Sequence, residues 1–496
     1  MVVCLIAPFL ACATWAQEPP QLFTPRPGHL EFSGRMIARP VQDNPVARAA
    51  ARAEVQDWIL HEYSEVDEFI LIVPEGQNEN SFAAQLMASG DWEYVHPDWI
   101  CYPLVIPNDP LFGDQWHHTQ IQSAEAWDWF HSAPTRIAAW TDTGVDTDHV
   151  DLVNQLIPGY NAVDRLTQEQ GGDLEDINGH GTVVGGTIGA TGNNGEGVAG
   201  VVWDIQLLPV RVSNDPGGGA YLSDLEHGAR WAVDNGASTI SASYSGVEYS
   251  SVQTTGAYVR SMGGLYLYAA GNDDVDHSGF DWDDVVVVGA SDENDDKAWF
   301  SSYGTAVDLT APGLYIWATE MGGGYRSASG TSLSTPIANG VAALMWGANP
   351  FLSSHELEQR IYAACDDIGE PGEDNVFGHG RANLRKGVEH AFEGNLSILT
   401  PNLVAGSWGH ISVDGAAPGQ PVYLGYSTVG SAIQELPLLQ TSIGLISPQL
   451  ADQRVADANG HATFHRYIPI ELMGQAVWLQ AAVYRDTSQV DARMIQ

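Results

Sequence analysis

Basic residues are scarce in this chain of 496 residues. Its 62 Asp and Glu residues outnumber its 20 Lys and Arg residues, which gives a formal net charge of −42 at pH 7. Lys297 and Lys386 are the only lysines. Because proteins bind nucleic acids by neutralising phosphates with basic side chains, this balance excludes nucleic acid as a natural partner. The acidity favours solubility and is similar to that of proteins from saline water, but an ordinary solvated acidic surface accounts for it equally well.

Cysteine is also scarce, with four residues at positions 4, 12, 101 and 365. Only Cys365 lies beyond residue 106. A chain without residues 1–106 could form no internal disulfide, so its stability would come from packing, with or without bound metal.

Long apolar runs are absent, since no stretch approaches the roughly 18 residues that a membrane-spanning helix needs. The short run from Val2 to Ala13, followed by small residues, predicts a secretory signal at residues 1–16, although it has no charged start. A buried N-terminal strand is the alternative. We expect a secreted, extracellular protein, with lipid anchoring at Cys12 as a minor alternative.

Three short segments bring together the residue types of a serine nucleophile and its helpers. They are Asp142-Thr143-Gly144, His180-Gly181-Thr182 and Gly330-Thr331-Ser332. A serine hydroxyl is a poor nucleophile at neutral pH, so Ser332 needs a base, and that base needs an acceptor that fixes its tautomer. His180 and Asp142 are of the right types for these two roles, and each segment carries a glycine where the backbone must turn or come close to another group.

Two other classes of protein share parts of this pattern. Asp142-Thr143-Gly144 alone is also typical of aspartic proteases, but such an enzyme needs a second copy of the motif or a homodimer, and the chain has no second copy. A non-catalytic relative that acts as a binding or surface protein is the other alternative. It would be indicated by a missing member of the aspartate, histidine and serine set, and all three are present.

Further segments extend the pattern and identify the family that the chain resembles. They are Ile137-Ala138-Ala139-Trp140, Trp231-Ala232-Val233-Asp234-Asn235-Gly236, Ala269-Ala270-Gly271-Asn272, Phe300-Ser301-Ser302-Tyr303-Gly304 and Ala311-Pro312-Gly313. With the three segments above, they make the chain similar to the subtilisin-like serine proteases from about Asn108 to about Phe392. The resemblance implies a serine endopeptidase that acts on proteins or peptides, a monomer, and an N-terminal propeptide that inhibits it from within the same chain.

The resemblance also implies roles for individual residues. Asn272 would donate to the oxyanion that forms on the substrate. The substrate would bind beside Ser243, Tyr244, Ser245, Ala270 and Gly271. The chain departs from the family pattern here, because the family usually has Ser-Leu-Gly where this chain has Ser243-Tyr244-Ser245. It departs again in two places where the family usually has histidine. One is Val183, and the other is Ile337 in the segment Pro336-Ile337-Ala338-Asn339-Gly340.

Calcium is the cofactor that the resemblance implies. Asp151 and Asn194 fall where the family's tight calcium site takes side-chain ligands, and oxygen atoms are the ligands that calcium prefers. The alternative is that Asp151 caps a turn and that Asn194-Gly195 is a simple turn, since the Asn194 loop is one residue longer than usual.

The order of apolar segments predicts the fold. Strands at residues 205–212, 238–243, 265–270 and 285–289 alternate with helical patterns, one of them opened by a capping box at Ser223–Glu226. Such alternation predicts an α/β fold with a doubly wound parallel sheet, and sites in these folds lie at the carboxyl ends of the strands.

Composition divides the chain into further units. We predict a signal peptide at 1–16, a propeptide at 17–106, the catalytic domain at 107–392 and a C-terminal domain at 393–496. The propeptide has a proline-rich start, helices near 46–61 and 80–89 and strands near 69–73 and 92–96, so we expect a small α+β fold, with an unrelated α+β domain as the alternative. Strands near 421–425, 462–467 and 476–480, with a hairpin at Asn459-Gly460, predict an all-β sandwich of unknown role.

Overall fold

The computed structural model describes residues 23, 32–101, 105–350, 352–392, 396–400, 403–416, 421–429, 434–436, 441–443, 445, 448–457, 461–483, 486–487 and 491–495. The expected signal peptide with Cys12, residues 102–104 of the expected propeptide tail and the expected hairpin at 459–460 lie outside the described residues. Among the residues that the structure describes, no helix is both long and apolar enough to cross a bilayer.

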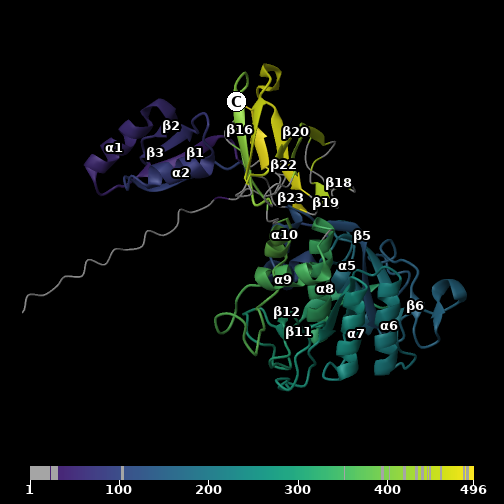
Figure 1. Ribbon diagram of the computed structural model, residues 1–496. Helices are drawn as coiled ribbons and strands as arrows, with labels where there is room; N and C mark the ends of the chain where they lie inside the picture. The colour runs from purple at the N-terminus through teal and green to yellow at the C-terminus, as the bar shows by residue number, and fades with distance from the viewer. Residues whose placement is uncertain are drawn as a thin grey trace, which may run out of the picture.

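The largest unit is built on an eight-stranded sheet (Figure 1). In spatial order its strands are β12 (Leu309–Pro312), β11 (Val286–Ser291), β10 (Leu265–Ala269), β9 (Thr239–Ala242), β5 (Ser132–Asp142), β8 (Asp204–Arg211), β6 (Tyr160–Asn161) and β7 (Leu166–Thr167). All neighbours pair in parallel except β6 and β7. Every residue of β9, β10 and β11 is buried, as expected for parallel strands that are covered on both faces.

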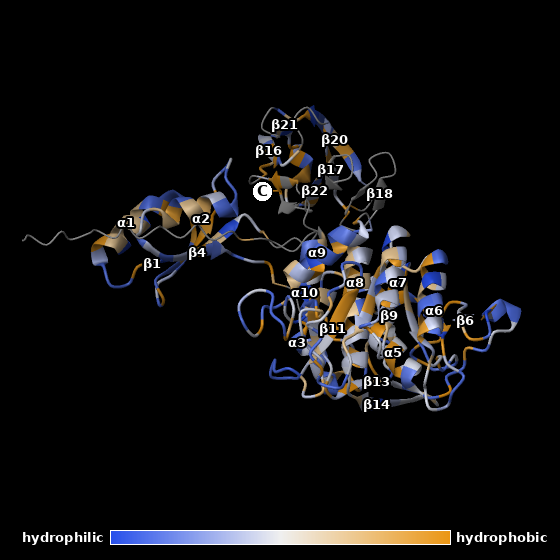
Figure 2. Ribbon diagram, turned by 60° about the horizontal axis from the view of Figure 1, so that its bottom comes forward, coloured by the Kyte–Doolittle hydropathy of each residue, from blue (hydrophilic) through white to orange (hydrophobic). Residues whose placement is uncertain are grey.

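Helices cover both faces of this sheet. The first hydrophobic core joins one face to α5 (His180–Gly189), α8 (Thr331–Ala348), α9 (Ser354–Ala364) and α10 (Leu384–Phe392). The second core joins the other face to α6 (Leu222–Asp234) and α7 (Ser250–Ser261). Figure 2 shows the apolar strands between these layers. The predicted doubly wound α/β fold is confirmed.

The chain reverses its direction across the sheet at β5. After β5 it forms β6, β7, α5 and β8 on one side, and it then crosses to β9, β10, β11 and β12 on the other side. Ligand sites of open α/β sheets lie at such a switch point, beyond the carboxyl ends of the strands. Asp142 is the last residue of β5 and therefore lies at that point.

Shorter elements complete this unit. They are the 3-10 helices Phe112–Asp114 and Gln168–Gln170, α3 (Trp116–Gln120), α4 (Ser123–Trp127), and the hairpin strands β13 (Ile316–Glu320) and β14 (Gly324–Ala328). The expected capping box at Ser223–Glu226 is wrong. α6 begins at Leu222 with Tyr221 as its N-cap and no side-chain cap, so Ser223 already lies within the first turn.

The N-terminal unit is a small α+β fold, as predicted. Its antiparallel sheet has the order β2 (Ile59–Tyr63), β3 (Glu68–Ile72), β1 (Arg35–Pro40) and β4 (Trp92–Pro97), with α1 (Pro45–Val55) and α2 (Glu79–Met87). The helix expected over 46–61 is too long. It ends at Val55, and after a 3-10 turn at Gln56–Trp58 the chain pairs with β3, because a strand pairing outweighs the local helical pattern.

The C-terminal unit is the predicted β-sandwich. One sheet contains β15 (Ser397–Leu399), β16 (Trp408–Asp414) and β21 (Ala462–Tyr467). The other contains β20 (Gln449–Val455), β17 (Pro421–Ser427), β22 (Ala476–Val483), β23 (Asp486–Thr487) and β24 (Asp491–Met494). A separate pair is formed by β18 (Gln434–Leu436) and β19 (Thr441–Ile443), and a 3-10 turn lies at Ile470–Leu472. Ile411 and Phe464 from the first sheet share one core with Leu424 and Leu479 from the second.

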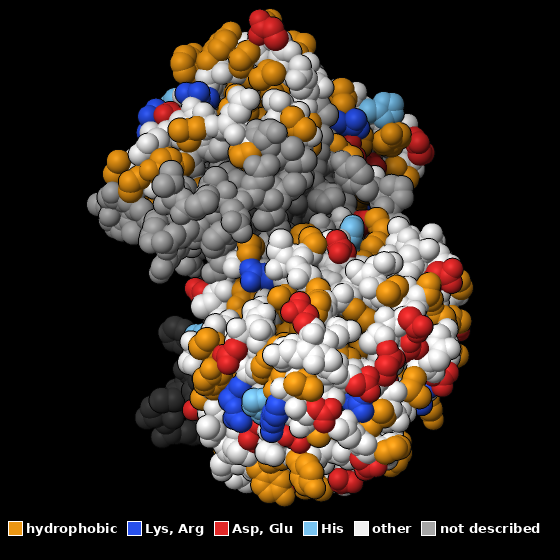
Figure 3. All heavy atoms as spheres, turned by 90° about the vertical axis from the view of Figure 1, so that its right-hand side faces the viewer, with side chains coloured by type: hydrophobic (Ala, Val, Ile, Leu, Met, Phe, Trp, Pro, Cys, Tyr) orange, Lys and Arg blue, Asp and Glu red, His pale blue; other side chains and the backbone are white. Residues whose placement is uncertain are grey.

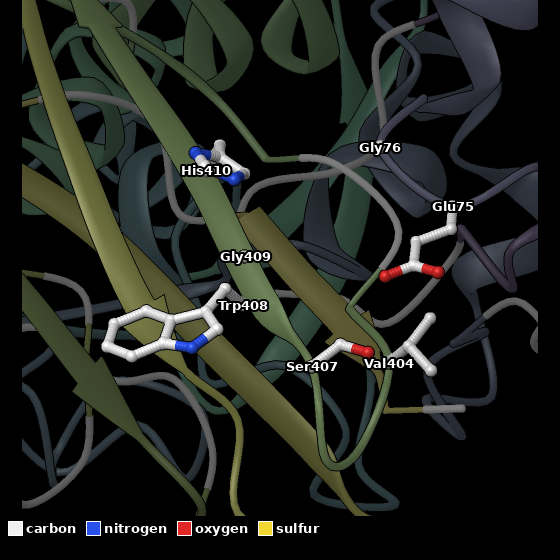
Figure 4. A pocket seen from close by; sticks show the side chains of 7 residues that line it. All are labelled: Glu75, Gly76, Val404, Ser407, Trp408, Gly409 and His410. Atoms are coloured by element: carbon white, nitrogen blue, oxygen red, sulfur yellow. The ribbon is translucent and has the colours of Figure 1, made fainter.

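The two smaller units lie beside each other (Figure 1). They meet at a pocket of about 240 Å³, with Glu75 and Gly76 on one side and residues of β16 and the segment before it on the other (Figure 4). Figure 2 shows β13 and β14 at the far end of the largest unit from both smaller units. Figure 3 shows acidic side chains spread over one face of the largest unit, in keeping with the chain's net charge.

Candidate active site

Asp142 and His180 meet where β5 ends and α5 begins. The Nδ1 atom of His180 lies 2.7 Å from Oδ1 of Asp142, and the Thr143 backbone N–H donates to the same oxygen at 2.8 Å. Asp142 is fully buried, whereas 33% of the His180 side chain is exposed. The carboxylate therefore orients the imidazole through Nδ1, and part of the ring remains exposed to solvent.

This pairing determines how readily the imidazole holds a proton. Burial alone would lower the pKa of His180, but the charge and hydrogen bond of Asp142, together with the charge of Asp176, outweigh it and raise the pKa above its usual value. The imidazolium that forms when a histidine takes a proton is thus favoured at this position.

The glycines of the two segments allow this close approach. A Cβ atom on Gly144, whose φ is +121°, would lie 2.7 Å from the carbonyl oxygens of Leu174 and Glu175. A Cβ atom on Gly181 would lie 2.1 Å from the carbonyl oxygen of Gly144. The segments after β5 and at the start of α5 therefore interlock through their backbones, which only glycine permits.

Ser332 lies in the first turn of α8, and a proline shapes its surroundings. Pro336 has no N–H, so the helix cannot donate to the Ser332 carbonyl four residues earlier. The Ser243 hydroxyl donates to that carbonyl instead, at 3.2 Å, and the Ser332 hydroxyl donates to the Ser243 carbonyl at 3.3 Å. Ser332 therefore makes no hydrogen bond to His180 in this structure. Catalytic hydrogen bonds are often long or absent without substrate, so a rotation of the hydroxyl toward His180 is compatible with this geometry.

Asn272 is held by its side-chain oxygen. The Thr331 backbone N–H donates to Oδ1 of Asn272 at 2.8 Å, and the Thr331 hydroxyl donates to the same atom at 3.0 Å. With its oxygen occupied in this way, the Nδ2 group is the polar group of Asn272 that remains to donate to a substrate. The Ser332 backbone N–H lies in the first turn of α8, where helix N–H groups have no partner within the helix. The two groups are a suitable pair of donors for a developing oxyanion.

The expected substrate-binding residues contribute in different ways. The Tyr244 hydroxyl donates to the Gly218 carbonyl at 2.9 Å, and its ring centroid lies 6.2 Å from that of His180. Ser245 is exposed, and Gly271 is partly exposed. Ala270 is fully buried in the second core, so its side chain does not line a cleft.

Asp151 and Asn194 lie together, as the sequence predicts. Nδ2 of Asn194 donates to Oδ1 of Asp151 at 2.7 Å, and the Val198 backbone N–H donates to Oδ2 at 3.3 Å. The sequence analysis missed Asp109, a buried carboxylate whose Oδ2 accepts from the Asn193 backbone N–H at 2.6 Å. Burial raises the pKa of Asp109, and the charge of Asp151 adds to this effect. The Asn108-Asp109 pair at the start of the catalytic domain was the available signal.

These residues fit a cation, although they form no cluster of three acidic, histidine or cysteine side chains within the described part of the chain. Oδ1 of Asp109 is buried and has no hydrogen-bond partner. Two neighbouring buried carboxylates and an unused oxygen are favourable for calcium, which takes oxygen ligands and neutralises their charge.

The fold and the residues at the switch point are those of a serine hydrolase. The subtilase family pattern matches residues 137–380. Thermitase from Thermoactinomyces vulgaris is 35% identical over 288 residues, which are 57% of this chain and 99% of thermitase. A halolysin-like extracellular serine protease from Natrialba magadii is 30% identical over 323 residues, 62% of this chain and 58% of that protein. A protease structure from Pseudoalteromonas arctica PAMC 21717 matches with a TM-score of 0.51 and 28% identity, covering 58% of this chain and 100% of that one. The chain belongs to the subtilase family and is a serine endopeptidase.

Thr331 allows the oxyanion assignment to be tested. Asn272→Ala should lower kcat by roughly 10²- to 10³-fold with little change in KM, the loss known for the oxyanion asparagine of subtilisin. Thr331→Val removes the hydroxyl bond to Asn272 and the bond that the same hydroxyl accepts from the Gly271 backbone N–H at 3.2 Å. It should lower kcat by roughly tenfold, about the worth of one hydrogen bond.

Thr335→Val is the matched control for this experiment. Its hydroxyl donates to the Thr331 carbonyl at 2.8 Å and does not contact Asn272, so kcat should stay at the parent's value. If Asn272→Ala raised KM and left kcat unchanged, Asn272 would be a substrate-binding residue and not the oxyanion donor.

Proposed function

We propose that the chain hydrolyses protein and peptide substrates outside the cell, with Asp142, His180 and Ser332 as its catalytic triad. The main support is the 2.7 Å contact between Asp142 and His180 at the switch point of the sheet, with Ser332 in the first turn of α8. Secretion is supported by the apolar N-terminal segment and by relatives that are named extracellular.

The mechanism follows from these three side chains. Nε2 of His180 takes the proton of the Ser332 hydroxyl as Oγ bonds to the scissile carbonyl carbon, and the carbonyl π electrons move to its oxygen. Asp142 stabilises the imidazolium, which then gives its proton to the departing amine as the C–N bond breaks. Water attacks the acyl-enzyme in the same way and restores Ser332.

The oxyanion formed in each step would be stabilised by Asn272 and the Ser332 backbone N–H. Both donors are held in place before the substrate arrives, so little reorganisation is needed during the reaction. The side chain of Asn272 cannot easily turn away, because its oxygen accepts two hydrogen bonds from Thr331.

We propose a broad specificity with a preference for leucine, phenylalanine or tyrosine before the scissile bond. Ser243, Tyr244, Ser245 and Gly271 carry no charged side chain, so a substrate pocket formed beside them would suit an apolar group. Acidic side chains follow Asn272 at Asp273, Asp274 and Asp276. Nζ of Lys297 lies 2.7 Å from Oδ1 of Asp274 and offsets part of this negative charge. These aspartates should therefore disfavour acidic substrate residues only weakly.

Residues 17–106 are proposed to be a propeptide that the catalytic domain removes, and residues 393–496 a separate accessory domain. We propose that this propeptide inhibits the catalytic domain of the same chain until it is removed. In Figure 2 the α+β unit lies beside the C-terminal unit and away from β13 and β14. The turn between β13 and β14 lies beside the site, since Cβ of Met321 lies 3.6 Å from a Cβ built on Gly179.

Calcium is proposed as a structural cofactor held by Asp109, Asp151 and Asn194, with backbone carbonyls completing the set. Bound there, it would supply positive charge between two buried carboxylates and tie the start of the catalytic domain to the segments around Asp151 and Asn194. It would take no part in the chemistry at Ser332.

Loss of the nucleophile should block both catalysis and maturation. Ser332→Ala should lower turnover on the order of a million-fold, the loss measured in subtilisin itself, and should leave an uncut precursor when the protein is made alone. Gel analysis and labelling with a fluorophosphonate check this. Normal processing of the purified variant, with no other protease present, would disprove the assignment of Ser332.

Removal of calcium from the proposed site should lower the thermal stability of the unsubstituted protein, called the parent below. A ligand that binds only the native state stabilises it by mass action, so a chelator should lower the thermal midpoint and added calcium should restore it. Asp151→Asn should make the midpoint insensitive to chelator, whereas Asp204→Asn, at an exposed carboxylate, should behave as the parent does. An Asp151→Asn variant that responded like the parent would remove Asp151 from the site.

The proposed specificity can be read from the peptides of a casein digest by mass spectrometry. Cleavage should follow leucine, phenylalanine and tyrosine most often, because an uncharged cleft stabilises apolar side chains that leave water. Strict cleavage after arginine, or after glutamate, would contradict this reading of the cleft.

A further inference from the structure

Asp176 is a buried carboxylate four residues before His180, and no step of the reaction above uses it. It is 8% exposed. Its Oδ1 accepts hydrogen bonds from the Thr143 hydroxyl at 2.7 Å and from the backbone N–H groups of Gly179 at 2.8 Å and Asn178 at 3.0 Å. Its Oδ2 accepts from the backbone N–H of Thr182 at 2.8 Å and from the Thr182 hydroxyl at 2.6 Å. Both carboxylate oxygens of Asp176 therefore accept several hydrogen bonds.

The donors to Asp176 flank the two residues that must stay aligned. Thr143 directly follows Asp142, Gly179 directly precedes His180, and Thr182 lies in the first turn of α5. The Thr143 hydroxyl in turn accepts from the Gly181 backbone N–H at 2.9 Å. A single side chain thus joins the end of β5 to the start of α5 on both sides of His180.

Asp176 also adds negative charge to the site. Burial alone would raise its pKa, but hydrogen bonds from Thr182, Gly179, Asn178 and Thr143 outweigh burial and lower the pKa below its usual value. The carboxylate is therefore ionised at neutral pH. The charged groups that act on His180 are Asp142 and Asp176, which favour the imidazolium, and Arg326, which opposes it.

We propose that Asp176 is a positioning residue for the reaction at Ser332, which holds His180 in register with Asp142 and provides a second negative charge for the imidazolium. This inference rests on the proposed catalytic triad. It assigns a function to a side chain that does not touch the substrate and that would otherwise be counted only as part of the fold.

The direction of the expected pH effect follows from the charge. His180 must be neutral to accept the proton of Ser332, so kcat/KM rises as pH rises through the pKa of His180 in the free enzyme. The charge of Asp176 raises that pKa. Asp176→Asn removes the charge, so the acidic limb of the kcat/KM profile should move to lower pH, while kcat at its plateau should fall because the imidazolium is less well stabilised.

The test compares Asp176→Asn with the parent, with activities expressed per active site after titration with a fluorophosphonate. We expect kcat to fall roughly ten- to hundredfold, the range for losing a hydrogen bond to a charged group, with KM unchanged and the acidic limb displaced to lower pH. Asp374→Asn is the matched control. That carboxylate accepts from three backbone N–H groups in a loop that takes no part in the site, so its loss should leave kcat and the pH profile unchanged.

Thr143→Val and Thr143→Ser provide a second test in case Asp176→Asn does not fold. Thr143→Val keeps the charge of Asp176 but breaks its link to β5, so kcat should fall while the acidic limb stays in place. Thr143→Ser keeps the hydroxyl and should restore kcat. The parent's kcat in Thr143→Val, or the parent's kcat and pH profile in a folded Asp176→Asn, would overturn the proposal.

Asp142→Asn, measured in parallel, separates this proposal from the triad on which it depends. If Asp142→Asn is inactive and Asp176→Asn behaves like the parent, only the role of Asp176 is wrong. If Asp142→Asn also behaves like the parent, the triad itself is wrong.

Discussion

The burial of the Asp142 carboxylate is the constraint on which the site depends. A charge that is removed from water is costly unless hydrogen bonds and an opposite charge compensate it. Asp142 has the Thr143 N–H and the His180 imidazole as partners, and both lie on segments that must come close to it. Gly144 and Gly181 are required in this arrangement, because a Cβ atom at either position would push the two segments apart. The sheet, the interlocked turns and the imidazole thus form one cooperative unit around a buried charge.

The same principle extends to α8, which carries Ser332. Asn339 is fully buried and donates through Nδ2 to the Ala139 carbonyl at 3.1 Å and to the Ser241 hydroxyl at 2.9 Å. These bonds tie α8 to β5 and β9, the two strands at the switch point. The departure from the family pattern at Asn339 therefore places a polar anchor inside an otherwise apolar interface between α8 and the sheet.

The sequence was most informative where chemistry restricts the choice of residue. The strands β8 to β11 could be predicted because they are apolar runs between turn residues, and the rule for open α/β sheets predicted a site at their carboxyl ends. Side-chain hydrogen bonds could not be predicted in the same way. The roles proposed for Asp109 and Asp176 depend on hydrogen bonds to residues that are distant in sequence or on the exact path of a turn, and these contacts cannot be read from the sequence around either aspartate.

Tertiary pairing also explains the errors in the smaller units. The alanine-rich pattern after Pro45 is compatible with a long helix, but residues 59–63 gain more by pairing with β3. β1 lies in a proline-rich segment that has few strand signals, yet it pairs with both β3 and β4 at the centre of its sheet. In both cases the partner strand, and not the local sequence, decides the structure.

The dispersal of the site along the chain has a consequence for biosynthesis. A ribosome makes Asp142 and His180 early, but β5 gains its second neighbour only when β9 has emerged, and Ser332 follows later still on α8. Parallel pairing between such distant segments is slow compared with the folding of local structure. A nascent chain therefore lacks the proposed catalytic triad until α8 has been synthesised, so the order of the elements along the chain delays proteolytic activity until almost the whole catalytic unit has been made and folded.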